Sequence, residues 1–191
     1  MENTLEKQFF DFIYNRQLIW HKRFILKEKP PWTEDEILKK FKIINMYREL
    51  DRCTIYIINK LKEIKDREKV LLNLIFYRFF NTDQLYEKLE IGLLDRIECK
   101  QLIEKFNLLK KRGPIFSNAY LISSGTKGKA KHVEIIENLS KLNIRKIVEA
   151  LDKSKNPEES LKVLMKIPLV GPFLACEIWT DLTYFRFFKQ N

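Results

Sequence analysis

The chain has 191 residues, enough for one globular domain, and 45% of them are apolar, which can supply a core. Only five Gly and six Pro, with long stretches rich in Leu, Ile, Lys and Glu, argue against a β-sandwich or a disordered chain and favour an all-α fold. The 36 basic and 26 acidic residues give a formal net charge of +10, which suits a polyanion such as DNA, RNA or an acidic membrane but also serves plain solubility.

Cysteine and histidine are too few and too scattered for several kinds of site. Cys53, Cys99 and Cys176 have no CxxC spacing, which argues against a disulfide framework and against an iron–sulfur or zinc cluster. The two histidines, His21 and His132, lie far apart, so a His-based metal site or a Ser–His triad is not expected. We therefore expect no metal and no cofactor. Without a signal-peptide pattern or a membrane-length apolar run, we expect an intracellular protein and no membrane partner.

Helical periodicity runs through most of the chain, beginning with residues 4–26. After a polar break that closes with two prolines, Thr33 is expected as an N-cap, with Glu36 as its capping-box partner. Trp32 and Ile37 are expected to form the hydrophobic staple of the same helix. The predicted helices run from Thr33 to about Asn45 or beyond, and over about residues 50–64, 68–80, 94–111, 131–139 and 143–152, with a short one after Thr82.

A second clear helix start follows at Asn156, with Pro157 at the first helical position and Glu159 at the third. That helix should end near Lys166, before a tight turn and a further helix. No low-complexity tract or long linker marks a boundary, so we expect residues 1–191 to form a single helical domain.

The segment from Leu164 to Ala175 resembles the helix–hairpin–helix element of DNA glycosylases and related DNA-repair proteins, here within residues 157–184. Backbone N–H groups and the helix dipole at such a turn suit a DNA phosphate. The candidate DNA-binding residues of this segment are Lys166, Pro168, Val170 and Gly171. Residues 124–129, named here the basic glycine loop, add Lys127 and Lys129, and Lys131 follows the loop. The alternative is an ordinary αα-hairpin, because the family's element usually has glycine where this chain has Leu169.

A polar cluster follows the first capped helix. At helical spacing Arg48, Asp51 and Arg52 share one face, and Asn45 lies one turn before them. We expect these four to line a cleft as candidate catalytic residues, with Asp51 kept ionised by the adjacent arginines. The alternative is an intrahelical salt-bridge network on a solvated face. Asp181, a carboxylate beyond the hairpin, is a further catalytic candidate.

The run Pro31-Trp32-Thr33, continued to Asp51-Arg52, resembles the helical domain family of 5-hydroxymethyluracil DNA kinases, which is grouped with the alpha-glutamyl/putrescinyl-thymine pyrophosphorylases. Further pieces match in order: Phe76 to Asn81, Asn118 to Tyr120, the basic glycine loop and Ile167 to Tyr184. The resemblance implies a DNA-glycosylase-like fold that binds double-stranded DNA. It also implies action on a modified thymine as a transferase of the pyrophosphorylase type. A base taken out of the duplex would stack on Trp32, Tyr47 or Tyr120.

Two motifs of related enzymes are missing from the sequence, the P-loop of kinases and the lysine of lyases. The sequence has no G-x-x-x-x-G-K-[ST], so kinase activity is not expected from this chain alone, and a P-loop kinase or another modification enzyme is an expected partner. Pro172 and Phe173 follow Gly171 where lyases carry a lysine. Since the resembled family usually continues past this point, a catalytic piece is expected from elsewhere. The other two functions considered are a divergent glycosylase, with Asp51 or Asp181 activating water, and a noncatalytic DNA-binding module that delivers DNA to a partner enzyme.

Overall fold

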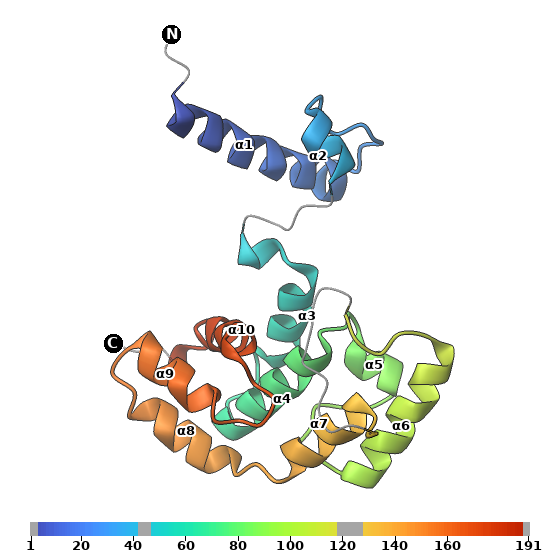
Figure 1. The fold of residues 1–191 in the computed structure, drawn as a ribbon, viewed down its shortest axis with the longest axis vertical. Coiled ribbons are helices and arrows are strands. Elements are labelled where there is room, and N and C mark those ends of the chain that lie inside the picture. The colour runs from blue at the N-terminus through green and yellow to red at the C-terminus, as the bar shows by residue number, and fades with distance from the viewer. Residues whose placement is uncertain (1–3, 42–46, 118–127, 189–191) are drawn as a thin grey trace. The chain divides into compact units, whose positions relative to one another are not determined.

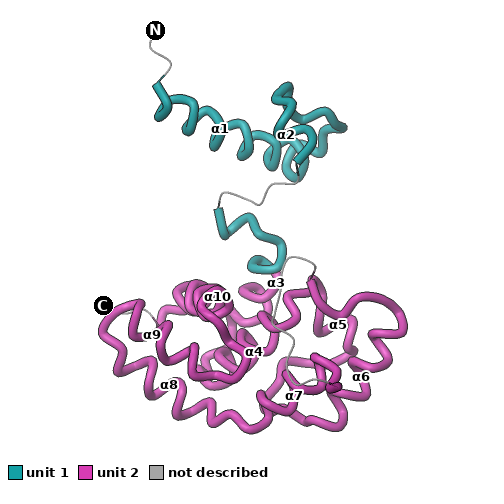
Figure 2. Tube along the Cα trace, viewed as in Figure 1, with its two compact units in different colours: residues 1–55 teal, residues 56–191 magenta. Residues whose placement is uncertain are grey.

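The structure is a computed structural model that describes residues 4–41, 47–117 and 128–188. Within these ranges every regular element is helical and no strand occurs, which confirms the all-α prediction (Figure 1). Where a single domain was expected, contacts divide the chain into two compact units, Met1–Ile55 and Tyr56–Asn191 (Figure 2). Each unit is described by itself.

The first unit begins with α1, Leu5–Trp20, which continues into a π-helical turn, His21–Ile25. Thr4 caps α1, and its hydroxyl accepts a hydrogen bond from the Lys7 N–H at 3.3 Å. No residue of α1 is buried, although its periodic apolar side chains gave the strongest helical pattern at this end of the chain. The elements that follow in this unit are α2, Glu36–Lys40, and the 3-10 turn Arg48–Leu50. The next helix, α3, Arg52–Leu61, begins in the first unit and ends in the second.

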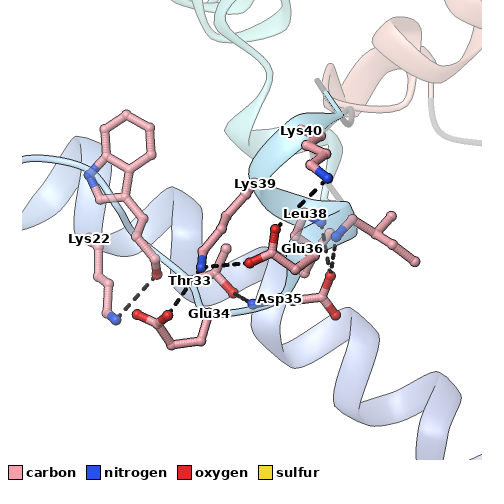
Figure 3. Close-up of polar contacts among 10 residues, drawn as sticks. Lys22, Thr33, Glu34, Asp35, Glu36, Leu38, Lys39 and Lys40 are labelled. Carbon is pink, nitrogen blue, oxygen red and sulfur yellow. Dashed lines mark hydrogen bonds and ion pairs between the residues drawn. The ribbon is translucent and has the colours of Figure 1, made fainter.

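The predicted helix start at Thr33 is wrong by two residues. Asp35 is the N-cap of α2, and its carboxylate accepts from the N–H groups of Ile37 and Leu38 at 2.8 and 2.9 Å (Figure 3). The Thr33 hydroxyl instead accepts from the Asp35 N–H at 3.2 Å. The predicted length is also wrong, because the backbone is already extended at Phe41 and α2 cannot reach the middle forties.

The second unit is built around α4, Arg67–Phe80. Asp66 caps this helix by accepting from the N–H groups of Glu68 and Lys69 at 2.9 and 3.1 Å. Every residue from Val70 to Phe80 is buried, as expected of a helix that is apolar on all sides. The core of the molecule therefore lies around α4.

The remaining helices of the second unit pack in two groups, with α4 between them (Figure 1). In the first group α5 packs on α6 and α6 on α7, and the rings of Phe80 and Phe106 join α6 to α4 with centres 4.1 Å apart. In the second group α8 and α10 pack on α4, and α9 packs on both α8 and α10. The bounds are α5 Leu85–Leu89, α6 Cys99–Arg112, α7 Lys131–Ser140, α8 Ile144–Asp152, α9 Pro157–Leu164, α10 Pro172–Leu182 and the 3-10 turn Arg186–Phe188.

A buried ion pair joins α4 to α10. The Arg78 Nε and Nη2 atoms donate to the two carboxylate oxygens of Asp181 at 2.5 and 2.8 Å. Arg78 also donates through Nη1 to the Asn81 side-chain oxygen at 2.8 Å. The exposed fractions of the Arg78 and Asp181 side chains are 1% and 0%. The charge on each side chain is thus compensated inside the core by a bidentate partner.

Replacing Asp181 with asparagine should lower the free energy of unfolding by about 3–5 kcal/mol, because the Arg78 charge would stay buried without its bidentate partner, and the Glu177 carboxylate lies farther away, 3.8 Å from the Arg78 Nη1 atom. Urea titration followed by circular dichroism measures this. The double variant Arg78→Met/Asp181→Leu should recover part of the loss, since both charges of the fully buried pair are removed, while Glu177 loses its contact with Arg78. A loss below about 1 kcal/mol in the single variant would show that the pair does not hold α10 in place.

Candidate nucleic-acid interface

Residues 157–182 form a pair of helices joined by a tight turn, named here the α9–α10 hairpin. The predicted start of α9 is confirmed, with the Asn156 side chain accepting from the Glu159 N–H at 2.9 Å and Pro157 in the first turn. The helix ends at Leu164, and the Ile167 N–H donates to the Leu164 carbonyl at 3.0 Å. Pro172 then begins α10, so both helix ends lie close to where the sequence placed them.

The turn of the hairpin has an inner and an outer side. Ile167 and Val170 are buried, together with Leu174 on α10, and fix the turn to the rest of the unit. Lys166 and Pro168 are exposed, as the DNA-binding prediction required of them. Val170 does not fit that prediction, because its side chain is buried and its N–H already donates to the Ile167 carbonyl at 3.1 Å. A ligand would therefore meet the residues around Val170 and not Val170 itself.

Leu169 occupies the turn position at which the helix–hairpin–helix element that this segment resembles usually has glycine. Its φ is +68°, in the left-handed region that favours glycine. A residue with a Cβ adopts this conformation at a cost of about 1–2 kcal/mol, which the packing of the neighbouring residues offsets. The leucine therefore does not prevent the turn.

Gly171 is the N-cap of α10, with φ −86° and ψ 178°. Any residue adopts this extended conformation, and a Cβ built at this position would meet nothing within 4 Å. The fold itself therefore does not require glycine here. Because glycine has no side chain, no side-chain hydrogen bond caps α10, and the N-terminal end of the helix is open on the side of Gly171.

The lysines of the basic loop are placed differently from one another. Lys127 lies outside the described residues. The Lys129 ammonium forms an ion pair with Glu137, so its charge is already partly compensated. The Lys131 ammonium lies 5.2 Å from the ring centre of Phe116, and burial lowers the pKa of Lys131. No observed interaction places either of the two described lysines, Lys129 and Lys131, beside the hairpin.

The predicted cluster of the first unit does not form one helical face, which corrects the expectation. Arg48 lies in the 3-10 turn, Asp51 is extended, and Arg52 is the first residue of α3. The Asp51 carboxylate accepts from the Thr54 N–H at 2.7 Å and so caps α3. Asn45 lies outside the described residues. The physical reason is that the helix assumed to carry all four residues ends before Phe41.

At helical spacing the apolar side chains of Ile37, Leu38, Phe41 and Tyr47 would share the buried face of that longer helix, but they lie mostly at the surface. Leu38 is buried, but Ile37, Phe41 and Tyr47 are 61%, 65% and 55% exposed. The pattern predicted a continuous buried stripe. The short α2 instead buries a single position, because the turn of extended backbone after Lys40 interrupts the helical period.

Of the three side chains proposed to stack on a base, Trp32 and Tyr47 lie within the described residues. The Trp32 indole N–H donates to the Glu28 carbonyl at 2.8 Å, and the Arg23 guanidinium lies 5.3 Å from the Trp32 ring centre. The Lys22 ammonium donates to the Trp32 carbonyl at 3.3 Å (Figure 3). Trp32 thus serves as an anchor for its own loop. Tyr47 is exposed, and Tyr120 lies outside the described residues.

Asp181 is placed where it cannot act as expected. A general base must reach the water that it activates, and both oxygens of this fully buried carboxylate are bound to Arg78. We assign Asp181 to the structure of the core, which corrects its place among the catalytic candidates. Sequence reasoning missed Arg78 as its partner. The available signal was a charged residue in the middle of an apolar helix, which needs a counter-charge when buried.

The described residues contain no group of three or more His, Cys, Asp or Glu side chains arranged to hold a metal ion. None of their helices combines the length and apolar character needed to span a membrane.

Residues 3–191 match the model of a protein family described as the helical domain of 5-hmdU DNA kinase. The chain belongs to this family. It is 28% identical over 198 residues to the 5-hmdU DNA kinase of Bacillus phage SP10, an alignment that covers 94% of this chain and 31% of the phage protein. The chain thus spans about a third of the length of that curated relative. No solved structure matches the chain.

Membership in this family confirms the resemblance drawn from the motifs at Pro31, Phe76 and Ile167. The family and the phage relative are both named for a kinase, whereas a transferase of the pyrophosphorylase type was expected from the resemblance. The motifs were therefore sufficient to identify the family. They did not distinguish a kinase from a pyrophosphorylase.

Replacing Asp51 with serine separates the two roles open to this residue. Serine keeps the N-cap and removes the carboxylate, so the melting temperature should stay within about 2 °C of wild type. Alanine removes both, and should lower the free energy of unfolding by about 1 kcal/mol. If DNA affinity falls in both variants, the carboxylate contributes to binding; if the serine variant binds as wild type does, Asp51 only caps α3.

Proposed function

We propose that this chain is a DNA-binding domain that holds 5-hydroxymethyluracil-containing duplex DNA for a kinase active site located outside the helical domain. The observation that supports it most directly is the α9–α10 hairpin. Its turn is fixed from inside by buried Ile167 and Val170, and its outer side presents Lys166, Pro168 and the open helix end at Gly171. This combination suits a phosphate of the DNA backbone.

The charge of the chain supports the same partner. A net charge of +10 favours association with a polyanion at any sequence, and the hairpin contacts proposed here are to phosphate and not to base edges. Binding should therefore depend little on sequence. Selection of the modified base would come from the kinase site or from a pocket that accepts the base.

Phosphoryl transfer requires a cradle for the nucleotide phosphates, which the sequence of this chain does not provide as a P-loop. The curated relative is about three times as long as the part that this chain matches and is named a DNA kinase. A P-loop kinase, in the same polypeptide or as a partner, would supply the transfer step. The helical domain would contribute position and orientation of the DNA.

The noncatalytic role is better supported than a divergent glycosylase. A glycosylase needs a carboxylate able to activate water. The two candidate carboxylates already have protein partners: Asp181 is paired with Arg78, and Asp51 caps the N-terminal end of α3. A transferase of the pyrophosphorylase type would need cations gathered at one site. Arg48 and Arg52 lie on different elements, so the described geometry offers less support for it.

Affinity for a duplex oligonucleotide should fall steeply with salt, because binding to phosphates releases condensed counter-ions. The expected logarithmic slope is roughly −0.9 for each phosphate neutralised. Fluorescence anisotropy over about 50–300 mM NaCl measures it. Lys166→Ala should reduce the slope by about one phosphate, whereas Lys100→Ala, an exposed lysine on α6, should leave it unchanged. An affinity independent of salt would contradict the proposal.

Gly171→Asp should weaken duplex binding at least tenfold without harm to the fold. Aspartate is a better N-cap than glycine by a few tenths of a kcal/mol, and space is open at this position, so the melting temperature should stay constant or rise slightly. The same carboxylate would repel a phosphate at the helix end. Gly171→Asn is the matched control, since it caps the helix without the charge.

Anisotropy and thermal melting on the three proteins give the result. Wild-type affinity in the aspartate variant would show that the hairpin is only structural. A similar loss in the asparagine variant would point to steric exclusion, as expected if the phosphate lies against the Gly171 backbone.

A further inference from the structure

The α9–α10 hairpin has a second feature at its opposite end. A pocket of about 720 Å³ lies where the loop before α9, the end of α10 and the 3-10 turn Arg186–Phe188 meet. Its volume falls within the range of small-molecule sites. On α9 the pocket is lined by the first half of the helix, Pro157 and Ser160, whereas the proposed phosphate contact lies beyond Leu164 at the other end. The pocket is therefore a different place from the proposed phosphate contact.

Aromatic rings form much of its wall. Trp179, Phe187 and Phe188 line the pocket, and all three are only partly buried. The rings of Phe187 and Phe188 lie with centres 5.2 Å apart. Across the part of the chain that the structure describes, no acceptor is found for the Trp179 indole N–H. The wall thus offers flat apolar surfaces and a hydrogen-bond donor.

Among the charged side chains that line the pocket, Asp152 is paired and Lys155 adds a positive charge. Asp152 is ion-paired with Arg67, whose guanidinium also lies 4.9 Å from the Phe188 ring centre. Lys155 also lines the pocket, and its side chain is exposed. No ion pair of the Lys155 ammonium is found among the described side chains. An anionic group on a ligand would therefore meet an uncompensated cation.

We infer that this pocket binds a single nucleotide unit, with the planar base against the aromatic rings and its phosphate at Lys155. Stacking on aromatic side chains accepts every base, and a lysine ammonium binds phosphate as a point charge. The unit has two sources with the same chemistry: a free mononucleotide, or a nucleotide turned out of a DNA strand. The inference rests on the pocket alone and holds whether or not the hairpin binds DNA.

Tryptophan fluorescence tests it directly. With Trp20→Phe and Trp32→Phe, Trp179 is the remaining tryptophan, so quenching reports on the pocket. One arm uses thymidine and adenosine monophosphates, with thymidine and inorganic phosphate for comparison. The other arm uses a duplex with one unpaired extrahelical thymidine against the fully paired duplex.

We expect saturable quenching in at least one arm. Quenching by monophosphates identifies a free nucleotide as the ligand, and quenching by the extrahelical duplex alone identifies a nucleotide of the strand. Phe188→Ala should weaken binding about 5- to 100-fold through lost stacking. Lys155→Glu, an exposed change that leaves the core intact, should weaken monophosphate binding and spare thymidine.

Two results would overturn the inference: no saturable quenching in either arm up to about 10 mM mononucleotide, or quenching unchanged by both variants. Lys166→Ala separates this from the hairpin proposal. It should weaken binding of the paired duplex while mononucleotide quenching keeps its wild-type midpoint. Failure of duplex binding alone would therefore count against the hairpin and not against the pocket.

Discussion

The contact between Arg78 and Asp181 is the constraint on which the second unit depends. Two charges are held in a core of aromatic and aliphatic side chains, and they join residues 103 positions apart in the sequence. A buried pair adds little net stability over apolar residues of the same shape, but it penalises every arrangement in which the partners do not meet. In this chain it specifies where α10 lies against α4, and hence where the hairpin turn and the pocket at its other end are placed.

The sequence was most informative where a local signal was complete. At Asn156 the cap, the proline and the third-position glutamate act within one turn of helix, and the structure follows the prediction closely. At Thr33 the same kind of pattern was present, but Asp35 offers a carboxylate two residues later and accepts two N–H groups at once. Competition between neighbouring caps is decided by geometry over a few residues, which the pattern alone does not contain.

Some parts of the candidate site could be predicted from the sequence, and others could not. The hairpin was visible because proline and glycine restrict the backbone at known positions of a turn. The polar cluster around Asp51 failed because it assumed one uninterrupted helix, and the side chains change faces when that helix ends. The Arg78 partner and the aromatic pocket join residues far apart in the chain, so only packing brings them together. Local periodicity has no information on such pairs.

The left-handed backbone at Leu169 bears on which residues a turn of this shape can accept. Glycine at that position is a convenience worth about 1–2 kcal/mol, which a well-packed turn can do without. At Gly171 the situation is the opposite: the residue is glycine, although neither the backbone conformation nor the surrounding space requires it. A glycine that folding does not require is a better guide to an external partner than one that folding does.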